Sequence, residues 1–316
     1  MQLSRFPIAL MPLALLLGSV AICSPAIQGQ ERPKITGVSH MAIYTSNPVA
    51  ADRFYADGLG GSKQPDPENS KGVIYRFSEE QFIEVLPLPA QHSITRLDHV
   101  AFATTDAAAL HSYFAAHHYR EIDAVKTGPD GSKWFFTRDP EGNRVEFYQA
   151  AKHPFHATEN LVSPHIIHVG FVVKDRAKED SFYHDLLGFR PYWYGAMRPG
   201  KVDWVSQQVP DGHDWLEYMM TGPKSDSGPA DKIDARDLGV MNHFSLGVPN
   251  MEKAVTKLYA DDAIRFSPRH DGPAMGKDGK WQANLYDPDG TRVELMEFQP
   301  VIKPCCSEFT ASSPAD

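Results

Sequence analysis

Four histidines recur at equivalent places in four short apolar segments of this chain. Each lies on the small-residue face of an alternating pattern that predicts a β-strand. The four residues are His40, His99, His168 and His243. In the segment 166–173, Ile167, Val169 and Phe171 form the bulky face. The other face carries His168 beside Gly170, which leaves room for an imidazole ring.

A glutamate recurs in the same way, in a later strand-like segment of each unit. The four are Glu84, Glu146, Glu217 and Glu294, each facing away from bulky apolar neighbours. One such histidine alone is more often a hydrogen-bonded core residue, and one such glutamate is usually solvated. Their fourfold coincidence favours metal ligands, and imidazole with carboxylate suits Mn, Fe, Co, Ni or Zn. Without a metal, two carboxylates sharing a cavity would raise each other's pKa, so we expect one divalent metal per site.

The elements that must position these residues form a repeat. Each unit predicts a strand with the histidine, a helix, and about three strands, of which the last carries the glutamate. In the third unit the helix has Phe182 and Tyr183 on its apolar face and ends at Gly188. In the second and fourth units a tight turn, at 139–142 or 287–290, leads into the last strand. The chain therefore predicts an α+β fold of four βαβββ modules.

This pattern resembles the vicinal oxygen chelate (VOC) superfamily. That group includes glyoxalase I, extradiol ring-cleavage dioxygenases, methylmalonyl-CoA epimerase, and the fosfomycin and bleomycin resistance proteins. The resemblance covers residues 35–298, and the segments 168–189 and 286–298 carry its most specific motifs. It implies that the four βαβββ modules pair into two open-barrel domains, each able to hold a metal that coordinates two adjacent oxygens of a substrate. The sequence leaves open whether module one pairs with module two or with module four.

Carried over residue by residue, the resemblance implies two sets of ligands. The set in modules three and four is His168, Glu217, His243 and Glu294. The set in modules one and two is His40, Glu84, His99 and Glu146. Both match the His/Glu/His/Glu order of bacterial-type glyoxalase I, whereas a dioxygenase-type iron site would need only His168, His243 and Glu294. Because the C-terminal set satisfies both patterns, we expect the main site there and a second site or a relic in the N-terminal half.

The resemblance leaves three classes of function. Glyoxalase-like proton transfer, by an isomerase or lyase, is favoured because four ligands suit a metal that stabilises an enediolate. Glu217 and Glu294 are then the catalytic candidates that move the proton. An extradiol-type dioxygenase with Fe(II) is the alternative, although Asn284 occupies the place where those enzymes carry a proton-handling tyrosine. A non-catalytic ligand-binding protein of the resistance type is the third class, and the retained ligand sets disfavour it.

Composition limits the partners. The chain has 316 residues and a net charge of −9, with no basic stripe to neutralise phosphates, which argues against nucleic acid. We expect a small-molecule substrate, no stable membrane span, and a monomer or homodimer.

The amino-terminal segment predicts export. An apolar run ends at Ile22 and is followed by small residues, which is typical of a secretory signal peptide over residues 1–26. We therefore expect a periplasmic or extracellular protein. A lipid on Cys23 is disfavoured because Ile22 is bulky where a small residue is required.

The remaining sequence sets the domain boundaries. A polar link at 149–164 separates the two halves, and the last residues are rich in Ser and Pro. We place VOC domains at 35–150 and 165–300, and a mobile tail at 301–316. Cys305 and Cys306 are adjacent in that tail, where a disulfide between them would be strained.

Overall fold

The computed structural model describes residues 31–91, 94–152 and 154–315. The expected signal peptide and Cys23 lie outside these ranges, so export stays a prediction. Within the described ranges, no helix combines the length and the hydrophobicity needed to cross a bilayer.

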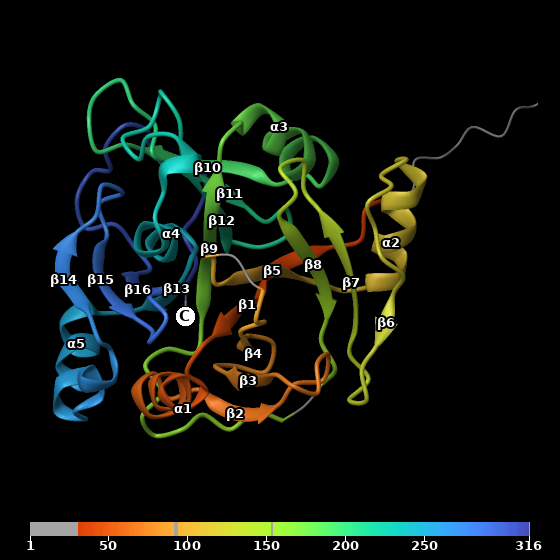
Figure 1. Cartoon of the computed structure of the whole chain (residues 1–316). Coiled ribbons are helices and arrows are strands. Elements are labelled where there is room, and N and C mark those ends of the chain that lie inside the picture. Colours follow the sequence, from red (N-terminus) through yellow and green to blue (C-terminus); the bar gives the residue numbers. More distant parts are fainter. Residues whose placement is uncertain (1–30, 92–93, 153, 316) are drawn as a thin grey trace, which may run out of the picture. The chain divides into compact units, whose positions relative to one another are not determined.

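Among the described residues, the strands form two eight-stranded mixed sheets (Figure 1). The first sheet contains β1 (Ile35–Thr45), β2 (Ser62–Pro65), β3 (Val73–Arg76), β4 (Phe82–Pro87), β5 (Leu97–Thr104), β6 (Lys126–Thr127), β7 (Lys133–Arg138) and β8 (Arg144–Gln149). The second contains β9 (Ile166–Val173), β10 (Arg190–Gly195), β11 (Trp204–Gln208), β12 (Trp215–Met220), β13 (His243–Val248), β14 (His270–Met275), β15 (Trp281–Tyr286) and β16 (Arg292–Glu297). The spatial orders are β2-β3-β4-β1-β5-β8-β7-β6 and β10-β11-β12-β9-β13-β16-β15-β14. The two orders are equivalent, which confirms the prediction of four βαβββ modules in an α+β fold.

The modules pair one with two and three with four. β1 lies parallel to β4 of its own module and antiparallel to β5 of the next. β9 lies in the same way between β12 and β13. The alternative pairing of module one with module four is excluded, because the first strands of modules one and two are directly hydrogen-bonded. Each sheet therefore brings the histidine and glutamate strands of two modules together at its centre.

A helical segment joins the first and second strands of each module. α1 (Pro48–Asp52) continues as the π-helical turn η1 (Arg53–Gly58), and α3 (Arg176–Asp180) continues as η2 (Ser181–Leu186). α2 (Ala107–Ala116) and α5 (Met251–Ala260) are regular α-helices. The other helical segments are η3 (Ala230–Lys232), α4 (Ala235–Met241) and η4 (Ala263–Phe266).

Local sequence explains where these helices begin and end. Asn47, Asp106, Asp175 and Asn250 precede the four module helices, and each side chain accepts a hydrogen bond from a main-chain N–H of the first turn. Gly188 follows η2 with a φ of +77°, a conformation that only glycine adopts without strain.

Tyrosines from the helical turns connect one sheet to the other. The hydroxyl of Tyr55 in η1 donates to Asp287, in the turn before β16, at 3.0 Å. The hydroxyl of Tyr183 in η2 donates to Asp139, in the turn before β8, at 3.3 Å. Between the central strands, the amide of Gln81 donates to a carbonyl of β1 at 2.9 Å and to one of β9 at 2.8 Å. Two of the motifs noticed in the sequence, the aromatic helix and the tight turn, therefore join the halves.

The C-terminal tail packs against the second sheet. The ring of Phe309 lies 4.8 Å from that of Tyr192, measured between centroids, and the indole N–H of Trp193 donates to the carbonyl of Cys305 at 3.2 Å. The structure joins Cys305 to Cys306 in a vicinal disulfide, where the sequence led us to expect none. These contacts hold the segment against the second sheet in this structure. The mobility of the tail and the domain boundaries stay predictions.

Strand β9 departs from the expected alternation at its start. Its register against β13 shifts after Ile166, so Ile166 joins the main core together with Val169. Ile167, expected on that bulky face, instead packs in a smaller cluster with Trp193 and Trp215. A β-bulge, which adds a residue to one strand of a pair, explains the change of face.

Candidate metal centres

In the C-terminal sheet, two histidines and two glutamates converge. The Nε2 atoms of His168 and His243 lie 3.0 Å apart. Oε2 of Glu294 lies 3.3 Å from Nε2 of His168 and 3.9 Å from that of His243. Oε2 of Glu217 lies 3.5 Å from Nε2 of His243. All four side chains are buried, and they are the four that the sequence singled out for the main site.

The N-terminal sheet repeats this arrangement. The Nε2 atoms of His40 and His99 lie 3.2 Å apart, and Oε2 of Glu146 lies 3.1 Å from the first and 2.9 Å from the second. Oε2 of Glu84 lies 3.6 Å from Nε2 of His99. The structure therefore brings together the second predicted set as well.

Strand register explains the convergence. Gly170 on β9 lies opposite His243 on one side and Glu217 on the other, and Ser245 on β13 lies between His168 and Glu294. A Cβ on Gly170 would come within 2.7 Å of Nδ1 of His243 and closer still to Cε1. The sequence suggested that this glycine leaves room for His168, but the ring that it admits is that of His243 from the neighbouring strand.

Hydrogen bonds donated by Nδ1 orient two of the rings. Nδ1 of His243 donates to the carbonyl two residues before it at 2.9 Å, and Nδ1 of His99 donates to the carboxylate of Asp98 at 2.6 Å. A proton on Nδ1 leaves the Nε2 lone pair free for a metal, and such second contacts fix ligand orientation. The ring of His168 is placed by stacking on Trp215, with the centroids 4.5 Å apart.

The donor sets fit a divalent cation. Oε2 of Glu84 and Oε1 of Glu146 are buried and receive no hydrogen bond from the described residues, which is unfavourable unless a cation is present. Burial, with Arg292 nearby, lowers the pKa of His243 well below its usual value and favours the neutral ring that a metal requires. Burial opposes ionisation of Glu294, but Arg292 and the neighbouring imidazoles outweigh it and lower the pKa of that carboxyl.

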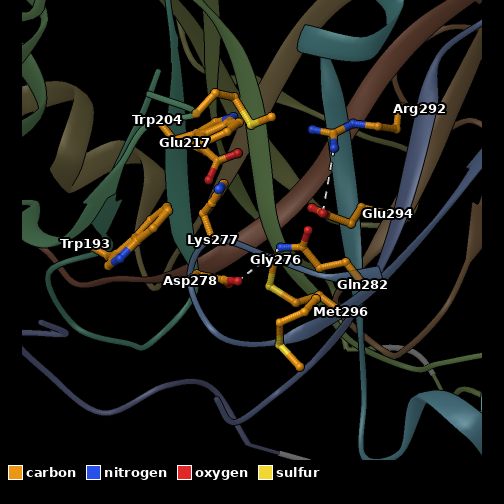
Figure 2. Close-up of a pocket in the computed structure, with 12 residues that line it drawn as sticks. Trp193, Trp204, Glu217, Gly276, Lys277, Asp278, Gln282, Arg292, Glu294 and Met296 are labelled. Carbon is orange, nitrogen blue, oxygen red and sulfur yellow. Dashed lines mark hydrogen bonds and ion pairs between the residues drawn. The ribbon is translucent and has the colours of Figure 1, made fainter. Parts of the chain in front are cut away.

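A cavity of about 250 Å³ adjoins the C-terminal set, and Glu217 and Glu294 form part of its wall (Figure 2). Both carboxylates turn toward the same space in that view. Further lining residues are Trp193, Trp204, Met296, Lys277, Asp278 and Arg292. Two tryptophans, Trp193 and Trp204, therefore form part of the cavity wall. Nη1 of Arg292 lies 3.7 Å from Oε1 of Glu294 and thus holds that carboxylate in place.

A buried lysine beside this set was missed in the sequence. Lys280 is fully buried, its Nζ has no hydrogen-bond partner among the described residues, and it lies 4.9 Å from the ring centroid of Trp215 and 5.3 Å from that of Phe309. Burial lowers the pKa of Lys280 to about 8, against the pull of Asp278 and Glu294. A lysine in a hairpin is ordinarily solvated, so no sequence signal could have found it.

The fold and the paired His/Glu sets together define a VOC-type protein. The chain belongs to the Glyoxalase/Bleomycin resistance protein/Dioxygenase superfamily, whose model matches residues 37–147 and 165–295. Both halves therefore belong to the family that the sequence resembles.

Several solved structures similar to this chain are 2,3-dioxygenases. Homoprotocatechuate 2,3-dioxygenase from Brevibacterium fuscum, in its anaerobic complex with 3,4-dihydroxyphenylacetate, has a TM-score of 0.61 and 17% identity, over 84% of this chain and 82% of that one. The same enzyme from Arthrobacter globiformis has a TM-score of 0.62 and 17% identity, over 84% and 80%. The 2,3-dioxygenase LapB from Pseudomonas sp. KL28 has a TM-score of 0.62 and 14% identity, over 87% and 97%. An uncharacterized protein, YwbC from Bacillus subtilis, is 27% identical over 124 residues, or 35% of this chain and 96% of YwbC. At these identities the structural likeness concerns the fold.

Proposed function

We propose that the C-terminal set binds one divalent metal and that the protein is an Fe(II)-dependent ring-cleavage dioxygenase of the extradiol type. The observation that carries the proposal is the convergence of His168, His243 and Glu294 beside a cavity that can hold a small molecule. Two histidines and one carboxylate with open coordination positions are typical of non-haem Fe(II) oxygenases. One dioxygenase with this fold has been solved in complex with 3,4-dihydroxyphenylacetate, a compound with two adjacent hydroxyl groups that can coordinate one metal. This likeness supports the same choice.

The residues around the set suit a flat aromatic substrate. When bound, Fe(II) would supply the redox chemistry that a reaction with dioxygen requires. Trp193 and Trp204 provide apolar walls for the ring, and apolar walls also limit the access of water. Glu217 lines the cavity and, as a carboxylate, can accept the proton that a substrate hydroxyl loses on binding.

The assignment of proton transfer to Glu217 follows from Asn284. This asparagine stands where extradiol enzymes carry a tyrosine, and its side-chain oxygen accepts a hydrogen bond from Arg292 at 3.4 Å. A carboxamide does not act as an acid or a base near neutral pH. Our proposal therefore assigns the proton transfer to Glu217, which is ionisable.

The second candidate is glyoxalase-like proton transfer, which the sequence alone favoured. The observation in its favour is Glu217, a carboxylate 3.5 Å from His243 that a three-ligand iron site does not need. With four protein donors, an octahedral metal has room for two substrate oxygens and none for dioxygen. Glu217 or Glu294 would then move a proton between adjacent carbons of a hydroxycarbonyl compound.

Oxygen uptake by anaerobically iron-loaded protein separates the candidates, with catechol and 3,4-dihydroxyphenylacetate as probes. Our proposal predicts one molecule of dioxygen consumed for each ring opened. Uptake should vanish in Glu294→Gln, slow in Glu217→Gln, and persist in Glu252→Gln, an exposed control on α5. No uptake, together with isomerisation of a hydroxycarbonyl compound that Glu217→Gln abolishes, would overturn the proposal in favour of the second candidate. A protein that takes up no metal would instead support the ligand-binding class.

The proposal extends to the cellular location and the oligomeric state of the protein. The apolar run that ends at Ile22 supports export of the enzyme to the periplasm or beyond. We also propose that it acts as a monomer or homodimer, since each paired-module sheet carries its own complete set of ligands.

A further inference from the structure

The loop between β2 and β3, residues 66–72, inserts two carboxylates into the N-terminal set. Oε1 of Glu68 lies 3.9 Å from Nε2 of His40, and the Glu68 side chain is only 6% exposed. Asp66 is also buried, and its Oδ1 accepts a hydrogen bond from the main-chain N–H of Glu68 at 2.7 Å, which fixes the loop. A Cβ on Gly72 would collide with Oδ2 of Asp66, so that carboxylate would have to shift to admit a side chain where the loop closes.

This insertion crowds carboxyl groups whose buried oxygens the described residues leave without hydrogen bonds. Four carboxyl groups lie around the two imidazoles: Asp66, Glu68, Glu84 and Glu146. Each has at least one buried oxygen that receives no hydrogen bond from a described residue. Buried charges are ordinarily paired or bind a metal. Of these oxygens, Oε1 of Glu68 lies 3.9 Å from Nε2 of His40, Oε2 of Glu84 lies 3.6 Å from Nε2 of His99, and Oε2 of Glu146 lies 3.1 and 2.9 Å from the two Nε2 atoms.

The equivalent loop of the C-terminal half supplies no such ligand. Residues 196–203, between β10 and β11, place Met197 in the wall of the cavity beside Glu217 and Glu294. The acidic residue of that loop, Asp203, is engaged elsewhere, accepting hydrogen bonds from the main-chain N–H of Met197 and the hydroxyl of Ser225. The C-terminal set therefore stays open to a cavity on the side where Glu68 covers the N-terminal set.

We infer that the N-terminal set is a second metal centre, closed and structural, in which Glu68 is a fifth protein ligand beside His40, Glu84, His99 and Glu146. Structural metal sites are filled by protein ligands, whereas catalytic sites keep a position open for water or substrate. The five ligands come from β1, β4, β5, β8 and the β2–β3 loop. A metal there links both modules of the first sheet, and its binding energy adds to the stability of the fold. This inference does not rest on the proposed reaction.

Metal content per chain, measured on the full-length protein after removal of loosely bound ions, gives the first test. We expect two metals in the wild type and one in both His243→Ala and His40→Ala. The carboxyl groups could instead stay protonated and bind no metal. His243→Ala would then contain none, which would overturn the inference.

Chelation in the His243→Ala protein tests the role of Glu68, because this variant reports the N-terminal metal alone. We expect dipicolinate to remove the metal slowly and to lower the midpoint of thermal unfolding once it is removed. Adding Glu68→Gln, which preserves shape, should speed release about tenfold or more. Adding Glu80→Gln, an exposed glutamate on the same module, should leave the rate unchanged. Equal release rates in the two double variants, or an unfolding midpoint that chelation does not move, would contradict a closed structural centre. Neither readout depends on catalytic activity.

Discussion

Replacing Gly170 with alanine tests how the fold positions His243. The added Cβ would lie 2.7 Å from Nδ1 of that ring and closer to Cε1, whereas ordinary contacts begin at 3.4 Å. The imidazole must therefore retreat by about 1 Å, while metal–ligand distances tolerate a deviation of only about 0.2 Å. We expect the C-terminal site to lose metal affinity by about 100-fold and the N-terminal site to keep its metal.

Overpacking alone also has a cost, so the variant requires a matched control. Gly247 lies on β13, the strand of His243, and a Cβ there would come within 2.6 Å of Ile167 and closer to the ring of Phe298. Both substitutions should lower the free energy of unfolding by about 1–3 kcal/mol.

The assay is a metal titration by isothermal calorimetry, with stability measured by urea denaturation. Metal affinity should fall only in Gly170→Ala, whereas Gly247→Ala should retain it at a similar loss of stability. Unchanged affinity in Gly170→Ala, or an equal loss in both variants, would show that Gly170 does not position His243 for metal binding.

Two further predictions concern buried polar groups. Burial lowers the pKa of Lys280 from 10.5 to about 8. Between about pH 8 and 10 the unfolded chain therefore binds more protons than the folded chain, and the free energy of unfolding of the metal-free protein rises with pH over that range. Lys280→Met should therefore raise the free energy of unfolding at pH 7 by about 3 kcal/mol and reduce its increase between about pH 8 and 10. If urea denaturation at pH 7 finds the variant no more stable than the wild type, the prediction is wrong. Tyr55→Phe removes the hydroxyl that donates to buried Asp287 and should lower the free energy of unfolding by about 1–3 kcal/mol, whereas the exposed control Tyr259→Phe should have no effect. Equal stabilities of the two tyrosine variants would show that the bond between the sheets contributes nothing.

The sequence predicted the fold and both His/Glu sets because these features repeat. His40, His99, His168 and His243 each lie on a strand whose alternation fixes the face of the side chain, and four copies of the same pattern are hard to produce by chance. The pairing of the modules depended on long-range hydrogen bonds between first strands, for which a single sequence carries no signal.

Other features of the sites depend on contacts that do not follow a periodic pattern. Glu68 comes from an irregular loop, and Lys280 comes from a hairpin, so neither shares the repeat that marked the ligands. Strand register determines which imidazole Gly170 admits, because its neighbour across the sheet is His243 and not His168. The shift that moves Ile167 out of the main core is likewise a bulge that alternation alone does not predict.

Anomalous X-ray diffraction from crystals grown with Mn(II) would locate the metal of the C-terminal half. We predict a peak in the C-terminal sheet at about 2.0–2.3 Å from Nε2 of His168, Nε2 of His243 and a carboxylate oxygen of Glu294. A map with no peak among these three residues, from crystals whose N-terminal set does show one, would contradict the claim that the C-terminal half holds the reactive metal.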